Sequence, residues 1–161
     1  MTVLSSSKDL DTLTLTMVAE FDATPESVWG VWEDPRKLER WWGPPTWPAT
    51  FERHDFTVGG DVGYYMTGPN GERAYGWWRF TAIDEPKSLE FDEGFAHDAS
   101  TPNHDMPTMR MRVDIEPAGD VTRMTVTTFF RDAAEMTQLS EMGMVEGMEG
   151  AAGQIDAILA A

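Results

Sequence analysis

Apolar and polar residues follow two different periods along this chain. Alternation is clearest within 107–116 and 120–130, where the apolar residues at 109–115 and at 124 and 126 alternate with polar ones. Because successive side chains of a strand point to opposite faces, this pattern predicts two strands with one buried face and one wet face. A similar alternation from Leu10 to Phe21 predicts a third half-buried strand. After Asp132 the apolar residues recur at spacings of three and four, which predicts one long helix ending near residue 160.

Capping and turn residues divide the part of the chain between these segments. Thr24 followed by Pro25 is typical of a helix start, and Pro35 begins a second short helix that we expect to reach Trp42. Beyond the Gly-Pro-Pro sequence at 43–45, turn signals such as Gly59-Gly60 separate a series of strands. The strands expected there are 49–57, 61–67, 73–83, 88–96, 107–116 and 120–130.

The order of these elements predicts the fold class. One strand, two short helices, six strands and a final helix is the order of an α+β helix-grip fold, in which a curved antiparallel sheet of about seven strands wraps around a long C-terminal helix. With 161 residues the chain has room for one domain, which we place at 9–161. Residues 1–8 lack a clear pattern, and we expect them to form a flexible tail.

The predicted final helix is rich in glycine and methionine. Gly143, Gly147, Gly150 and Gly153 each cost about 1 kcal/mol relative to alanine in a helix interior, so some other interaction must offset them. Two explanations are open. The glycines either let the helix pack closely on the sheet, or they join the flexible methionines in shaping a cavity.

Charge and composition narrow the classes of function. The formal net charge is -16 with no cluster of Lys or Arg, so we expect no nucleic-acid binding and interpret the acidity as a solubility feature. The chain has no cysteine, which excludes disulfides, thiolate zinc sites and a cysteine nucleophile. We find no signal peptide and no apolar run approaching the roughly 20 residues of a membrane span, so we expect a cytoplasmic protein without membrane insertion.

Several motifs, taken in order, resemble a known family. They cover most of the chain, from about 12 to 160. The chain resembles the START-like polyketide cyclase/dehydrase (SRPBCC) superfamily, and within it the branch of activator of heat-shock protein 90 ATPase homologues. The segments that carry the resemblance are Phe21–Trp29, Arg40–Pro44, His54–Gly60, Gly68–Gly71, Ile83–Pro86 and Gly119–Val126.

The resemblance implies a START-like, Bet-v-allergen-like fold and leaves three functions open, because fold does not determine chemistry. The first is a non-enzymatic module, monomer or homodimer, that binds a small hydrophobic molecule in a cavity between sheet and helix. The second is a cyclase, dehydrase or hydrolase acting on a polyketide-like ligand, with His54 or a cavity acid such as Glu93 as acid/base. The third is a co-chaperone-like regulator of a heat-shock ATPase. Of these we favour the non-enzymatic module.

The high aromatic content, with 7 Trp, 8 Phe and 3 Tyr, suits a cavity for an apolar or planar ligand. Strand alternation assigns side chains to the concave face, and the two tryptophans that flank Gly-Pro-Pro are expected at the cavity entrance. The predicted ligand-binding residues are Trp42, Trp47, Tyr64, Met66, Trp78, Phe80, Phe91, Met109, Met111, Met124, Val126, Leu139, Gly143 and Gly147.

Catalytic and metal-binding motifs are weak by comparison. His54, beside Asp55, is the one candidate general base, although a structural role near a strand end is the simpler explanation. His97 and His104 lie in a polar segment, 92–107, that we expect to be an exposed hairpin connection without a metal. No nucleophile elbow, phosphate loop or dinucleotide fingerprint is present, so no cofactor is expected.

Overall fold

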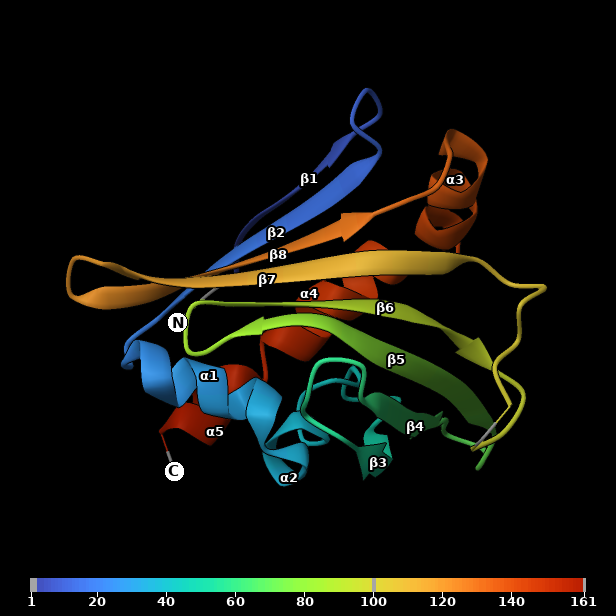
Figure 1. The fold of residues 1–161 in the computed structure, drawn as a ribbon, viewed down its shortest axis with the longest axis horizontal. Helices are drawn as coiled ribbons and strands as arrows, with labels where there is room; N and C mark the ends of the chain where they lie inside the picture. The colour runs from blue at the N-terminus through green and yellow to red at the C-terminus, as the bar shows by residue number, and fades with distance from the viewer. Residues whose placement is uncertain (1–2, 100, 161) are drawn as a thin grey trace.

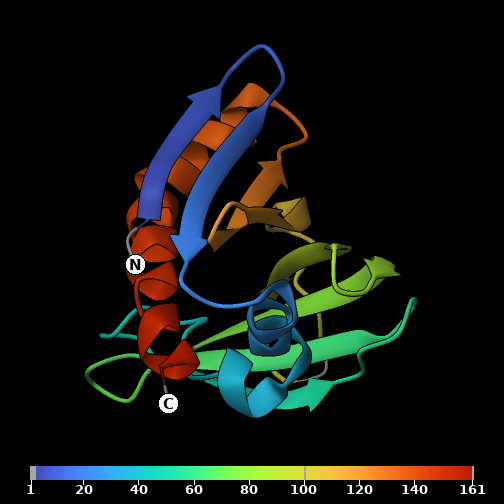
Figure 2. The same ribbon diagram turned by 90° about the vertical axis from the view of Figure 1, so that its left-hand side faces the viewer.

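One antiparallel sheet dominates the computed structural model, which describes residues 3–99 and 101–160 (Figure 1). Its eight strands lie in the order β1-β2-β8-β7-β6-β5-β4-β3. The helices lie on the inner side of its curve, as Figure 2 shows for the C-terminal segment. The fold is thus α+β and of the helix-grip type, as predicted. The strands are β1 (Val3–Asp9), β2 (Thr14–Phe21), β3 (Ala49–His54), β4 (Asp61–Thr67), β5 (Arg73–Asp84), β6 (Ser88–Ala96), β7 (Thr108–Ala118) and β8 (Val121–Phe129).

The helices are α1 (Pro25–Glu33), α2 (Pro35–Leu38), α3 (Ala133–Glu141), α4 (Met144–Ala152) and α5 (Ile155–Leu159). The predicted start of α1 is confirmed, because the Thr24 side chain accepts a hydrogen bond from the Ser27 backbone N–H. The second helix ends at Leu38, which is shorter than expected.

The prediction of a flexible tail at 1–8 is wrong for residues 3–8, because they belong to strand β1. Residues 1–2 lie outside the described residues. From Ser5 to Asp9 this strand pairs with β2, and it forms one edge of the sheet. The sheet therefore has eight strands, one more than predicted. An exposed edge strand needs backbone hydrogen bonds rather than an apolar face, so the polar Ser-Ser-Ser-Lys sequence carried no alternation signal.

The expected C-terminal helical segment is present, but it is not one continuous helix, because it is divided into α3, α4 and α5. The first break is at Gly143, whose φ of 88° is a left-handed conformation that ends α3 and precedes α4. The second break follows Ala152, around Gly153 and Gln154. Apolar spacing continued across both breaks, so the spacing alone did not reveal them.

The concave face of the sheet has two halves. In the packed half, α1 covers the sheet, and Trp32 contacts Trp78 and Phe91 at ring-centroid distances of 6.2 Å each. The open half lies opposite the junction of α3 and α4, where a smaller cluster of Leu15, Met109, Phe130, Met136 and Leu139 is buried. Most of α4 itself is only partly buried. This difference places the cavity described below.

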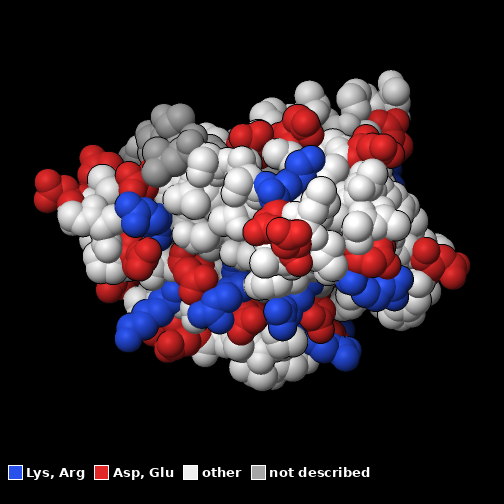
Figure 3. Space-filling view, turned by 90° about the horizontal axis from the view of Figure 1, so that it is seen from above, with Lys and Arg blue, Asp and Glu red and all other residues white. Residues whose placement is uncertain are grey.

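Ion pairs stabilise the outer face of the sheet, where acidic and basic side chains are interspersed (Figure 3). Arg112 contacts Glu90 at 3.1 Å and Asp114 at 3.0 Å, and Arg123 contacts Glu20 at 2.9 Å.

Within residues 3–99 and 101–160, no helix combines the length and the apolar character needed to cross a membrane.

Candidate functional site

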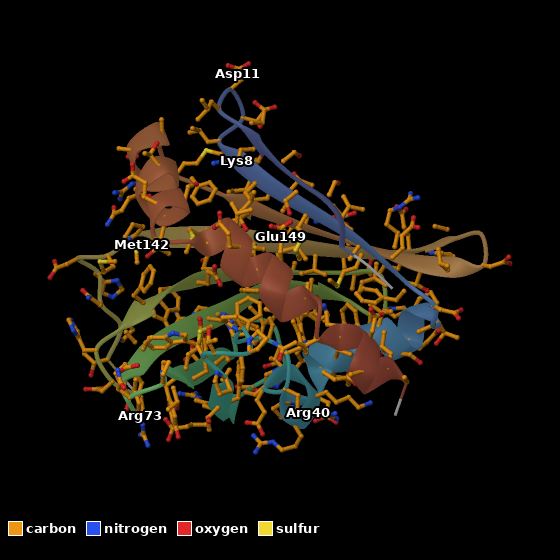
Figure 4. All side chains as sticks on the ribbon, turned by 180° about the vertical axis from the view of Figure 1, so that it is seen from behind. Lys8, Asp11, Arg40, Arg73, Met142 and Glu149 are labelled. Carbon is orange, nitrogen blue, oxygen red and sulfur yellow. The ribbon has the colours of Figure 1, made fainter. Side chains whose placement is uncertain are left out.

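A cavity of about 350 Å³, partly open to solvent, lies in the open half between the sheet and the C-terminal helices. Its lining comes from six strands, the α3–α4 segment, the Gly-Pro-Pro loop and Trp32 of α1. Met142, at the junction of α3 and α4, is labelled in Figure 4. Ten of the predicted residues line it: Trp42, Trp47, Tyr64, Met66, Met109, Met111, Val126, Leu139, Gly143 and Gly147.

Four predicted residues lie on the expected face of the sheet but outside the cavity, and these placements were wrong. Trp78, Phe80, Phe91 and Met124 are fully buried in the packed half. Trp32 of α1 fills the space above them, and its indole N–H donates a hydrogen bond to the Met124 sulfur at 3.3 Å. Strand alternation assigned these side chains to the correct face, but it contains no information on which part of that face a helix covers.

Other lining residues were missed. Phe95 could have been found, because it lies four residues beyond Phe91 on the same strand and so on the same face. Met144 and Met148 are four residues apart, but Met144 lies five residues after the predicted Leu139, so helical spacing from Leu139 did not indicate them. Trp32 and Trp41 had no such signal, because their place in the cavity depends on how α1 and the following loop pack. The remaining ones are Met17, Pro44, Ala74, Tyr75, Gly76, Gly94, Met142 and Ala151. Glu93, which the sequence suggested as a cavity acid, also lines the cavity.

The glycines of the C-terminal segment differ in their surroundings. A Cβ at Gly150 would make an ordinary van der Waals contact with Pro44 at 3.7 Å, so close packing does not require glycine there. Gly147 faces open space, since a Cβ there would have no neighbour within 4 Å. Gly143 supplies the positive φ. Gly147 therefore contributes to the cavity volume, which supports the second explanation for this position.

The loop that carries Trp42 and Trp47 is fixed to the helical segment. Gln154 donates through its side-chain nitrogen to the Gly43 carbonyl at 2.7 Å and to the Trp41 carbonyl at 3.3 Å. A Cβ at Gly43 would lie 2.0 Å from the Trp47 carbonyl oxygen, so only glycine fits this turn. These contacts hold Trp42 and Trp47 at the cavity, as predicted from their position around Gly-Pro-Pro.

Glu93 is the one carboxyl group in the cavity lining of the described residues. The residue is 7% exposed and lies on β6 opposite Trp78 of β5 and Met109 of β7. No described residue forms a hydrogen bond or ion pair with its side chain. Burial raises the pKa of Glu93 to about 8, because the surroundings solvate the charged form poorly. The predicted strand 88–96 is confirmed, and it places Glu93, from the start of the polar segment 92–107, inside the molecule.

Tyr64 lies close to this acid. Burial raises the pKa of its phenol, and the charge of Glu93 raises it further. The Tyr64 ring leans over Gly76 of the neighbouring strand, where a Cβ would lie 2.4 Å from the hydroxyl oxygen. The indole N–H of Trp42, which contacts Tyr64 edge-on at a centroid distance of 6.2 Å, has no hydrogen-bond partner among the described residues. The cavity thus combines apolar surface with a small polar region.

His54, the weak catalytic candidate, does not line the cavity. Its Nε2 bonds to the Trp32 carbonyl oxygen at 3.1 Å, and its ring stacks on Phe56 at a centroid distance of 5.6 Å. Burial lowers the pKa of this imidazole. The contacts support a structural role, which was the simpler explanation. His97 and His104 belong to no group of three metal-binding side chains among the described residues.

The fold and the cavity define a helix-grip protein with an internal binding space, and the comparisons identify its family. The family model described as "Activator of Hsp90 ATPase homolog 1-like protein" matches residues 22–160. The chain belongs to this family, as the motifs predicted. No curated protein matches it.

Solved structures agree with this assignment. A protein from Arthrobacter aurescens, solved by NMR in solution, is 53% identical with a TM-score of 0.94, over 99% of this chain and 92% of that one. Protein Ms6760 from Mycobacterium smegmatis is 44% identical with a TM-score of 0.90, over 98% of this chain and 96% of that one. An AHSA1 protein from Silicibacter pomeroyi, 24% identical with a TM-score of 0.72 over 91% and 97% of the two chains, shares the fold.

Proposed function

We propose that this protein binds a small hydrophobic or aromatic molecule in the cavity of the open half. The observation that carries the proposal is the cavity itself, about 350 Å³ with an aromatic and methionine-rich lining. Ligand sites in proteins have volumes of roughly 300–1,000 Å³ and combine apolar walls with a few polar groups. Flexible methionine side chains, such as Met142 and Met148, adapt to a ligand at low cost.

Native mass spectrometry tests this function on protein purified from its own host, with a denatured sample for comparison. We expect an apolar compound retained at close to one per chain. The variant Gly147→Leu places a side chain in the open space beside α4, and we expect it to lose the compound. Leucine favours a helix over glycine by about 0.8 kcal/mol, so this variant should fold at least as well as the wild type.

The matched control is Glu149→Leu, which adds the same side chain to the exposed side of α4 (Figure 4). This variant should retain the compound. An empty wild-type protein that also shows no thermal shift with a panel of lipids and aromatic polyketides would contradict the proposal. Equal retention by Gly147→Leu and the wild type would place the ligand elsewhere.

A second candidate function is catalysis on a polyketide-like ligand, and the state of Glu93 favours it. A general acid or base is most effective when its pKa lies near the working pH, and burial raises the pKa of Glu93 to about 8. With His54 outside the cavity, Glu93 is the acid/base candidate within the described lining. Product formation from the co-purified compound, with a rate that changes near pH 8 in the wild type and not in Glu93→Gln, would establish this activity. The co-chaperone hypothesis stays a prediction.

A further inference from the structure

The polar groups of the cavity restrict the charge of its ligand. Among the described residues that line it, there is one carboxyl group, Glu93, and no Lys, Arg or His. The other titratable side chains are the phenols of Tyr64 and Tyr75. An anionic ligand would therefore meet a carboxyl group and no cation.

The Glu93 carboxyl group has no hydrogen-bond or ion-pair partner among the described residues. Buried carboxylates in proteins are normally paired with a cation or with several hydrogen-bond donors, because an uncompensated buried charge is strongly unfavourable. The Glu93 side chain is 7% exposed, and no described residue supplies either kind of partner. The missing partner is supplied most simply by the molecule that occupies the cavity.

The aromatic lining also favours a cationic ligand. Seven lining residues are Trp, Tyr or Phe, among them Trp42, Trp47 and Tyr64. The faces of such rings carry negative potential and attract ammonium groups, more strongly where water is excluded. Rings beside a carboxylate form a site for an organic cation.

The net charge of the protein also favours a cationic ligand. A formal net charge of -16 raises the local concentration of cations near the surface and lowers that of anions. Access to the partly open cavity is thus favoured for a positively charged molecule.

We infer that the ligand is a hydrophobic amine, whose protonated nitrogen pairs with the Glu93 carboxylate while its apolar or aromatic skeleton fills the methionine-rich remainder of the cavity. This inference rests on the proposed function. A neutral ligand with a carbonyl group would accept a hydrogen bond from the protonated acid. It would pack on the rings but would gain neither the cation–π attraction of the ring faces nor the effect of the net charge, so the amine fits more of the observations.

Three probes that share a naphthyl ring and a short side chain test the inference by titration calorimetry: naphthylethylamine, which is cationic, propylnaphthalene, which is neutral, and naphthylacetate, which is anionic. With the wild type we expect the amine to bind about tenfold or more tightly than the neutral probe, and the anion to bind most weakly. In Glu93→Gln most of the advantage of the amine should be lost, since only the attraction of the ring faces and of the net charge remains, while the affinity for the neutral probe stays the same.

The control variant is Asp92→Asn. It removes the same charge from the adjacent residue of β6, whose side chain points to the opposite face of the sheet. This variant should keep the preference for the amine. If Asp92→Asn loses the preference for the amine as Glu93→Gln does, the preference comes from the electrostatic field of the whole protein. The inferred direct pairing of the amine with Glu93 is then wrong.

Proton exchange gives a second measurement. Because burial raises the pKa of Glu93 to about 8, the acid is mostly protonated at pH 7, and pairing with an ammonium ion releases that proton to the buffer. Titrations in two buffers of different ionisation enthalpy should show this release in the wild type and not in Glu93→Gln. Equal release in both proteins would overturn the inference.

The probes also separate this inference from the proposed function. If the neutral probe binds as tightly as the amine, the cavity binds apolar molecules but the amine preference is wrong. If none of the three probes binds, the proposed function is contradicted together with the inference.

Discussion

The packed half and the open half of the concave face are built from the same strands, yet one is a core and the other a cavity. Strand β6 crosses both, with Phe91 in the packed half and Phe95 at the cavity. Phe91 stacks on Trp78 at a centroid distance of 4.1 Å under the Trp32 ring, whereas Phe95 is only partly buried. The comparison shows that the covering helices, rather than the sheet, decide where a binding space forms.

The largest expected effect comes from truncating these two phenylalanines. Phe91→Ala should lower the free energy of unfolding by about 3–5 kcal/mol, because the surrounding rings are held in place and leave a cavity. Phe95→Ala, four residues away on the same face, should lower it by about 1–2 kcal/mol, since this side chain already borders open space. Urea denaturation followed by fluorescence measures both, and equal losses would remove the distinction between the two halves.

The pH dependence of stability should be the next largest effect, and it belongs to the open half. The pKa of Glu93 is raised in the folded protein to about 8, so its protonated form favours folding. This contribution is complete below the unfolded pKa near 4.5 and is lost as the pH rises through 8. We expect Glu93→Gln to match the wild type at pH 5 and to exceed it at pH 9 by up to about 4 kcal/mol.

Chemical denaturation of the two proteins at several pH values measures this difference, and other titrating groups cancel because both proteins contain them. Phe91→Ala should follow the pH dependence of the wild type, since the packed half holds no such acid. A constant offset between Glu93→Gln and the wild type from pH 5 to pH 9 would show that Glu93 is ionised throughout.

The smallest expected effect distinguishes two glycines of the open half. Neither would place a Cβ within 4 Å of another residue, but Gly143 has a φ of 88° and Gly147 lies within helix α4. Gly143→Ala should therefore destabilise the protein by about 1 kcal/mol through backbone strain. Gly147→Ala should stabilise it by about 0.5–1 kcal/mol through helix propensity. Thermal unfolding measures both, and shifts of the same sign would contradict the helix break at Gly143.

The amino-acid sequence by itself determined much of this protein. Alternation identified the faces of β7 and β8, capping residues identified α1, and the order of motifs identified the family. These features are local, because they depend on the period of side chains along one element and on residues with restricted backbone angles. Cavity residues such as Met109 and Val126 followed from the same periodicity.

Only the tertiary structure decided which part of the concave face stays open. Trp32 closes the packed half from a distant element, and Gly143 turns the chain between α3 and α4. The polar strand β1 likewise forms only because β2 offers it an edge. Each of these depends on contacts between residues far apart in the sequence, and no local periodicity encodes such contacts.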